Sequence, residues 1–248
     1  ADTIVFDKTG TLTHACPRVA KIVPFNGKEE AEMLRLAACL EEHFPHSMAN
    51  AVVEEARRRG LNHEERHAKV EYLVAHGIAS SVDGEQVRIG SAHFIFEDEK
   101  VTIPEGEQEK FDALPPEFSQ LYLAIDGVLS AVLCISDPVR EEAKDVLSAL
   151  RGLGVKNAVM LTGDSPRTAT AIAKELGVDD FRAGVLPADK ADYVSALRRE
   201  GHTVLMVGDG INDSPALSEA DAGIAISDGA AIAREIADIT IAADSLWE

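Results

Sequence analysis

Residues 3–13 read Thr-Ile-Val-Phe-Asp-Lys-Thr-Gly-Thr-Leu-Thr, an apolar run followed directly by a polar turn that contains a glycine. The apolar run predicts a buried parallel strand with the carboxylate of Asp7 at its carboxyl end, which is where open α/β sheets bind ligands. Gly10 and the hydroxyl residues beside it predict a turn whose backbone N–H groups can hold a phosphate. An aspartate in this place can attack phosphorus and become an aspartyl phosphate.

Two later segments repeat the pattern of an apolar strand that ends in a Gly/Asp turn. Residues 162–164, Thr-Gly-Asp, follow one apolar run, and residues 208–213, Gly-Asp-Gly-Ile-Asn-Asp, follow another. Such turns are common on protein surfaces, so any one of the three segments alone would indicate little. Because neighbouring parallel strands bring their carboxyl ends to the same edge of a sheet, the three together predict a single site.

The residues at these strand ends suit phosphoryl transfer, which needs a nucleophile, charge neutralisation and in-line geometry. Mg²⁺ prefers hard oxygen ligands and often takes only one or two carboxylates together with phosphate and water. Asp209 supplies a second carboxylate beside Asp7, and Lys190, at the start of a predicted helix, can neutralise developing charge. Thr162 can donate its hydroxyl to a phosphate oxygen, and Gly163 permits close approach.

The three segments resemble the motifs of P-type ATPases, and the chain resembles the cytoplasmic catalytic region of that family, whose fold belongs to the haloacid dehalogenase superfamily. The resemblance implies that the γ-phosphate of ATP is transferred to Asp7 with Mg²⁺ bound. The catalytic residues that we predict are Asp7, Lys8, Thr9, Thr162, Gly163, Asp164, Lys190 and Asn212. The predicted Mg²⁺ ligands are Asp7, Asp209, Asp213 and the backbone carbonyl of Thr9.

Strands and helices alternate in the last third of the chain, which predicts an α/β fold with a doubly wound, parallel, Rossmann-like sheet. The partner strands of the first strand come only after residue 135, so the middle of the chain reads as an insertion. We therefore predict a phosphorylation domain at 1–23 and 135–248, and a nucleotide-binding domain at 24–134.

The insertion has its own pattern. Helical periodicity at 29–40 and 47–59 is followed by hairpin signals at Asp83-Gly84 and Asp126-Gly127. These features predict an α+β domain built on an antiparallel sheet, and we expect the acidic segment 97–118 to be a surface loop.

A second group of residues, in the insertion, resembles the nucleotide-domain pattern of heavy-metal-transporting P-type ATPases. That pattern has a glutamate five residues before a His-Pro pair, then Gly-x-Gly, then Gly-Asn. The resemblance implies that His46 stacks on adenine, that Glu41 accepts from its exocyclic amine, and that two glycines let the base lie close to the backbone. The predicted nucleotide-binding residues are Glu41, His46, Gly77, Ile78 and Gly90.

Three positions depart from that pattern. Ser47 stands where a proline follows the histidine, Ala75 replaces the first glycine, and Ser91 replaces the asparagine. Ser47 is a good helix N-cap and can keep the orientation of the histidine, whereas Ala75 can narrow the pocket. The departures predict weak ATP affinity.

Composition limits the classes of function. The chain has 248 residues and a formal net charge of −19, which argues against a nucleic-acid partner because phosphate binding needs a basic footprint. No apolar stretch reaches the ~18 residues that a membrane helix requires. The first residue lies almost inside a core strand, so we expect a soluble piece of a longer protein.

Other candidate metal ligands are isolated in the sequence. The three cysteines show no CxxC spacing, which indicates free thiols in a reducing compartment, and Cys16-Pro17 alone does not make a metal site. His43 with His46, and His63 with His67, could each bind a metal, but neither pair has a nearby cysteine or further close ligands.

We therefore expect the catalytic region of a P-type ATPase that moves a heavy-metal cation, placed at the cytoplasmic face of a membrane. The implied partners are ATP and the transmembrane and actuator domains of the same transporter, and we expect the fragment to be monomeric. One alternative is a soluble phosphatase of the same superfamily, which usually carries a second aspartate where this chain has Thr9. The other is a regulatory nucleotide-binding module without catalysis. Against it argues the intact set of Asp7, Thr162, Lys190, Asp209 and Asp213.

Overall fold

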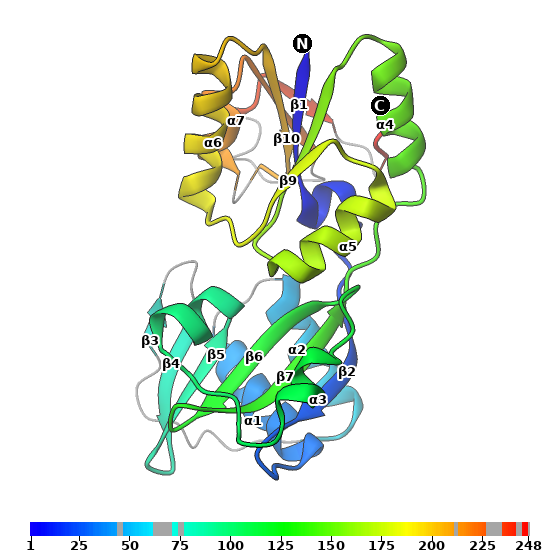
Figure 1. The fold of residues 1–248 in the computed structure, drawn as a ribbon. Helices are drawn as coiled ribbons and strands as arrows, with labels where there is room; N and C mark the ends of the chain where they lie inside the picture. The colour runs from blue at the N-terminus through cyan, green and yellow to red at the C-terminus, as the bar shows by residue number, and fades with distance from the viewer. Residues whose placement is uncertain are drawn as a thin grey trace. The chain divides into compact units, whose positions relative to one another are not determined.

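The chain divides into two compact units, each of which is described by itself. The split unit comprises Ala1–Ala15 and Pro138–Glu248, and the inserted unit comprises Cys16–Asp137. The computed structural model in Figure 1 describes residues 1–43, 47–61, 71–73, 77–210, 213–226, 235–241 and 245–247.

The split unit is built on a parallel sheet, as its strand–helix alternation predicts. In the residues that the structure describes, the order of its strands is β12-β11-β10-β1-β8-β9. The strand carrying Asp7 is therefore central, with β8 on one side and β10 on the other (Figure 1). The bounds are β1 (Thr3–Asp7), β8 (Asn157–Leu161), β9 (Asp180–Arg182), β10 (Val204–Gly208), β11 (Ala222–Ile226) and β12 (Ile239–Ile241).

Helices cover both faces of this sheet. Ile4 and Phe6 of β1 pack in a cluster with α4 (Ala143–Gly152) and α5 (Pro166–Leu176). Val5 packs in another cluster with α6 (Pro187–Arg199) and α7 (Ser214–Glu219). Successive side chains of a strand point to opposite faces, so both faces of β1 are buried. This explains why its short apolar run is continuous instead of alternating between apolar and polar residues.

The inserted unit is built on an antiparallel sheet with the described strand order β2-β7-β6-β5-β4-β3. Asp83-Gly84 and Asp126-Gly127 both adopt positive φ, and each joins two antiparallel strands, which confirms the predicted hairpins. The bounds are β2 (Arg18–Pro24), β3 (Glu71–Leu73), β4 (Gly77–Val82), β5 (Glu85–Gly90), β6 (Ser119–Ile125) and β7 (Val128–Ser136).

Both faces of the antiparallel sheet are also covered. Helices α1 (Glu30–Glu41) and α2 (Ser47–Arg58) share one apolar cluster with it. The other face is covered by a short π-helical segment (His93–Asp98), by α3 (Gln108–Asp112) and by the chain around them. The prediction of a surface loop at 97–118 is right only in part: most of the segment is exposed and irregular, but it contains α3, and its Val101 and Leu114 are buried in this second core.

The boundaries of the two units differ from the predicted domain limits. The chain leaves the split unit after Ala15 and returns at Pro138, rather than near residues 23 and 135. The reason is that β2 pairs antiparallel with β7, with Arg18 opposite Ser136. In the part of the chain that the structure describes, no helix is both long and apolar enough to cross a bilayer.

Candidate active site

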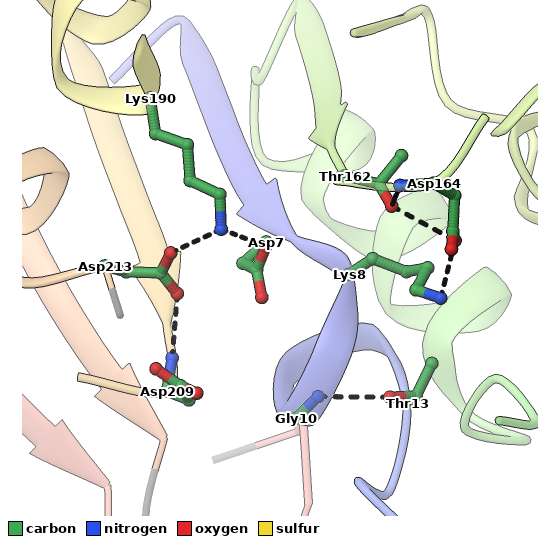
Figure 2. Close-up of polar contacts among 9 residues, drawn as sticks. All are labelled: Asp7, Lys8, Gly10, Thr13, Thr162, Asp164, Lys190, Asp209 and Asp213. Atoms are coloured by element: carbon green, nitrogen blue, oxygen red, sulfur yellow. Dashed lines mark hydrogen bonds and ion pairs between the residues drawn. The ribbon is translucent and has the colours of Figure 1, made fainter. Parts of the chain in front are cut away.

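The three predicted strand ends meet at the carboxyl edge of the parallel sheet. Asp7 is the last residue of β1 and lies opposite Leu161, the last residue of β8. Thr162 follows immediately, and Gly208 ends β10 on the other side of β1. Figure 2 shows the side chains from these ends gathered around Asp7 and Lys190.

Lys190 joins two carboxylates that come from different strand ends. Its Nζ donates to Asp7 Oδ1 at 2.6 Å and to Asp213 Oδ1 at 2.7 Å (Figure 2). The three side chains are only 8%, 9% and 0% exposed. Lys190 lies near the start of α6 and Asp213 immediately before α7, so two helices on one face of the sheet supply the partners of Asp7.

Burial and neighbouring charges shift the pKa values at this site. Burial raises the pKa of Asp7 to about 7, helped by the nearby carboxylates of Asp213 and Asp209 and opposed by the charge of Lys190. Burial alone would lower the pKa of Lys190, but its attraction to Asp7 and Asp213 outweighs burial and raises it. Lys190 therefore remains a protonated ammonium, held between the two carboxyl groups of Asp7 and Asp213.

The loop after β1 packs against the loop after β10. Gly10 has a φ of +79°, and a Cβ built on it would lie 3.4 Å from Cβ of Asp209 and 3.9 Å from its Oδ2. The backbone N–H of Asp209 donates to Asp213 Oδ2 at 3.2 Å. These contacts place Asp209 and Asp213 on the same side of the Asp7 loop, as sheet adjacency predicts.

Gly208 is a site residue that the sequence reasoning missed. A Cβ at this position would lie 2.5 Å from Oδ2 and 2.9 Å from Cγ of Asp213, closer than real atoms approach. Only glycine therefore leaves room for the buried carboxylate of Asp213. The available signal was the glycine directly before Asp209, since glycines often mark close backbone approach.

A second ion pair lies on the β8 side of Asp7. Lys8 Nζ is 2.7 Å from Asp164 Oδ2, and the two side chains are 3% and 10% exposed. The Thr162 hydroxyl donates to the same carboxylate oxygen at 3.1 Å and accepts the Asp164 backbone N–H, also at 3.1 Å. Gly163 lies exposed in the turn between them. Lys8 and Asp164 thus neutralise each other while Thr162 orients the aspartate (Figure 2).

The donors at this edge fit Mg²⁺ by their chemistry, since they are hard carboxylate oxygens. Among the described residues no three His, Cys, Asp or Glu side chains form a ready-made metal site. The edge with Asp7, Asp209 and Asp213 therefore suits an ion that takes one or two carboxylates and fills its remaining positions with water and phosphate. Asn212, the remaining predicted residue of this group, lies outside the described residues.

The predicted nucleotide residues that the structure describes lie in the inserted unit. Gly77 and Gly90 are directly opposite each other in the β4–β5 pair. Glu41 is the last residue of α1 and is buried, and Ile78 is part of the core that α1 and α2 share with the sheet. His46 lies outside the described residues, as do Ala75, His63 and His67.

Gly77 has a structural explanation within its own unit. A Cβ on Gly77 would lie 2.3 Å from Cδ1 of Phe94 and 2.6 Å from the carbonyl oxygen of Ile89. Phe94 is one of the largest fully buried side chains of the second core. Glycine is therefore required here by packing, whatever the unit binds.

The chain is similar in sequence and fold to known proteins. The zinc-exporting P-type ATPase of Mycobacterium marinum is 42% identical over 99% of this chain, and the copper-exporting P-type ATPase of Staphylococcus haemolyticus is 40% identical over 97%. The chain spans 34% and 29% of their lengths. The solved catalytic domain of the CPx-ATPase CopB-B matches with a TM-score of 0.77 and 27% identity, covering 99% of this chain and 85% of that one.

A zinc-transporting PIB-type ATPase solved in its E2.Pi state gives the same result for a longer protein. It matches with a TM-score of 0.57 and 39% identity over 96% of this chain and 38% of that one. The chain thus resembles the catalytic region of heavy-metal P-type ATPases, as its motifs indicate. A family model described as haloacid dehalogenase-like hydrolase matches residues 1–221. With its parallel sheet and an aspartate at the end of the central strand, the chain belongs to the haloacid dehalogenase-like hydrolase family.

Proposed function

We propose that this chain is the catalytic region of a P-type ATPase that exports a heavy-metal cation, and that Asp7 receives the γ-phosphate of ATP. The observation that carries the proposal is the buried carboxylate of Asp7 held 2.6 Å from Lys190 at the carboxyl edge of the sheet. A buried nucleophile next to a fixed positive charge meets two main needs of phosphoryl transfer.

The proposed step forms one bond and breaks one. An oxygen of the Asp7 carboxylate attacks the γ-phosphorus, the bond from this phosphorus to the β–γ bridging oxygen breaks, and ADP leaves. Lys190 stabilises the charge that develops on the phosphoryl oxygens, and Lys8 is a second cation within the loop. Thr162, Gly163, Asp164 and Asn212 complete the catalytic set that we propose.

Mg²⁺ is the metal that we propose for this site. Asp7, Asp209, Asp213 and the carbonyl of Thr9 would hold it, and it would neutralise phosphate charge. Among these groups, Asp209 is the partly exposed carboxylate that flanks Gly10.

Thr9 favours an ATPase over the phosphatase alternative. Phosphatases of this superfamily usually place a second aspartate two residues after the nucleophile as a general acid, and this chain has a threonine there. Without local assistance to water attack, the aspartyl phosphate should persist. A persistent intermediate suits a cycle that couples phosphorylation to conformational change.

We assign the split unit as the phosphorylation domain and the inserted unit as the nucleotide-binding domain. Glu41, His46, Gly77, Ile78 and Gly90 are the proposed nucleotide contacts. Their support is the paired position of Gly77 and Gly90 and the burial of Glu41 at the end of the helix that packs on the same sheet.

Two further proposals, a heavy-metal ion as cargo and additional domains in the whole protein, rest on the relatives alone. The relatives are named as exporters of zinc, manganese, copper or silver. The chain covers about a third of their length, 34% for the zinc exporter, so we propose that transmembrane and actuator domains complete the protein. The catalytic region would then lie on the cytoplasmic side of the membrane.

The test is phosphoenzyme formation from γ-labelled ATP with Mg²⁺, followed by an acid quench and treatment with hydroxylamine. We expect an acid-stable, hydroxylamine-labile label that Asp7→Asn abolishes while ATP binding remains nearly intact. Asp189→Asn is the matched control, because Asp189 is an exposed aspartate of α6, the helix that carries Lys190. Equal labelling of Asp7→Asn would exclude Asp7, and rapid phosphomonoester turnover would favour the phosphatase.

A further inference from the structure

Arg140 is a buried arginine that contacts the loop after Asp7. It lies between β7 and α4, where the chain re-enters the split unit, and is only 4% exposed. Its Nε donates to the carbonyl oxygen of Thr11 at 2.8 Å. A guanidinium is always charged and arginine is rarely buried in full, so an arginine in this position indicates a role for its contacts.

The backbone of the same segment makes further contacts with the same loop. The N–H of Arg140 donates to the carbonyl oxygen of Leu12 at 2.8 Å, and Val139 pairs antiparallel with Thr13. Two successive carbonyls of the loop are therefore held by one residue, through its side chain and through its backbone.

The loop needs such support because it does not form a regular element. Thr9 has a ψ of 123° and Gly10 a φ of 79°, so helical geometry is interrupted directly after Asp7. The loop closes on itself through two contacts, from Gly10 N–H to Thr13 Oγ1 and from Thr13 N–H to the carbonyl oxygen of Lys8, each 3.1 Å. The segment that carries Arg140 thus holds the far part of a loop that begins directly after Asp7.

We propose that Arg140 is a positioning residue for phosphoryl transfer, which acts by holding residues 8–13 in the conformation that receives the phosphoryl group. The inference rests on the proposed function of Asp7. Arg140 does not touch the reacting atoms, so its effect comes through the placement of Lys8 and of the loop N–H groups. Misplacement of such groups by about 1 Å can lower a rate on the order of 100-fold.

The geometry of the contact suggests a discriminating variant. Arginine donates from a rigid planar group, whereas lysine carries a point charge on a flexible stem. Arg140→Lys keeps the charge and removes the directed Nε donor to Thr11. Arg151→Gln is the matched control, because Arg151 also donates to a backbone carbonyl, that of Gly177, but on the exposed side of the unit.

The experiment measures binding of the phosphoryl analogue BeF₃⁻ in the presence of Mg²⁺ by ¹⁹F NMR, on the full chain, with thermal unfolding recorded for each variant. We expect folded Arg140→Lys to bind BeF₃⁻ about tenfold or more weakly, as displaced loop donors should. Arg151→Gln should bind with unchanged affinity. If Arg140 served stability alone, Arg140→Lys would lower the unfolding temperature and leave the affinity of the folded protein for BeF₃⁻ unchanged.

Three other outcomes are decisive for the role of Arg140. A folded Arg140→Lys with the affinity of the unaltered protein would overturn it while leaving the proposed function intact. If Arg140→Lys does not fold, Arg140→Met removes both the buried charge and the donor to the Thr11 carbonyl oxygen. Unchanged affinity of that folded variant would overturn the inference. Failure of the unaltered protein to bind BeF₃⁻ would overturn the proposed function and the inference with it.

Discussion

Lys190 Nζ lies 2.6 Å from Asp7 Oδ1, although the two residues are 183 positions apart in the chain. The contact brings the start of a helix to the end of the central strand, and it leaves a charged amine beside the proposed nucleophile. The relationship makes Lys190 the strongest single test of the proposed chemistry.

Lys190→Met should reduce the rate of phosphoenzyme formation on the order of 100-fold or more, the size of effect that loss of one preorganised donor has elsewhere. Methionine keeps the side chain unbranched and only one atom shorter, but it leaves Asp7 and Asp213 without their shared cation. Rapid-quench measurement with γ-labelled ATP tests this, with Lys174→Met, an exposed lysine of α5, as the control. A rate within a few fold of the unaltered protein would remove Lys190 from the mechanism.

The pKa of Asp7 predicts a pH dependence of stability in the absence of Mg²⁺. Between its ordinary value of 3.8 and about 7, the folded protein keeps a proton on Asp7 that the unfolded chain has released. The contribution of Asp7 to stability therefore falls as the pH rises through this window and stays at its lower level above about pH 7. Asp7→Asn lacks this dependence, so its unfolding temperature relative to the unaltered protein should be higher at pH 8 than at pH 5. An equal difference at both pH values would contradict the raised pKa.

Gly208→Ala should impair phosphorylation without changing any ionisable group. The added Cβ would lie 2.5 Å from Asp213 Oδ2, so the buried carboxylate must move away from Lys190. We expect a loss of about 1–3 kcal/mol in unfolding free energy, typical of overpacking, together with slower labelling. Gly152→Ala is the control, because a Cβ there meets nothing within 4 Å. Labelling of Gly208→Ala at the normal rate would mean that the position of Asp213 is not critical.

Gly77→Ala should destabilise the inserted unit through packing. The new Cβ would lie 2.3 Å from a ring carbon of Phe94 and 2.6 Å from the Ile89 carbonyl oxygen, and backbone cannot yield cheaply. An unfolding free energy lower by about 1–3 kcal/mol, measured by urea denaturation, is the expected result. Unchanged stability with weaker ATP binding would indicate that Gly77 serves the nucleotide alone.

His46→Ala should weaken ATP binding while leaving stability nearly unchanged. The reason is its spacing of five residues from Glu41, which resembles an adenine-binding pattern, and the place of Ser47 at the start of α2. Isothermal titration calorimetry with ATP measures the effect, and His93→Ala, at a partly exposed histidine of the same unit, is the control. The same dissociation constant in His46→Ala and the unaltered protein would place adenine elsewhere.

The elements that the amino-acid pattern predicted well are those with a local signature. The apolar runs that end at Asp7, Leu161 and Gly208 form strands, and the Asp-Gly pairs at 83–84 and 126–127 form hairpin turns. These signals work because burial and turn geometry are encoded within a few neighbouring residues. Proximity of the strand ends then followed from the rule for parallel sheets.

The pattern failed where the outcome depends on a distant partner. Segment 97–118 is polar enough to read as a loop, yet Val101 and Leu114 are buried because the antiparallel sheet has a second face to cover. β2 belongs to the inserted unit because β7, more than a hundred residues later, pairs with it. Neither partner is visible in the local sequence.

The amino-acid sequence by itself therefore determined which side chains stand at the strand ends and so which chemistry we propose, since the type of side chain at each position is a local property. Only the tertiary structure decided which of these side chains contact one another. The contacts join positions that strand order and helix placement bring together: Lys190 with Asp7 and Asp213, Lys8 with Asp164, and Arg140 with the loop after Asp7. Side-chain distances of this kind depend on how whole elements pack, because a hydrogen bond requires its atoms to be placed to within a fraction of an ångström. Only packing of the complete sheet and its helices achieves that placement.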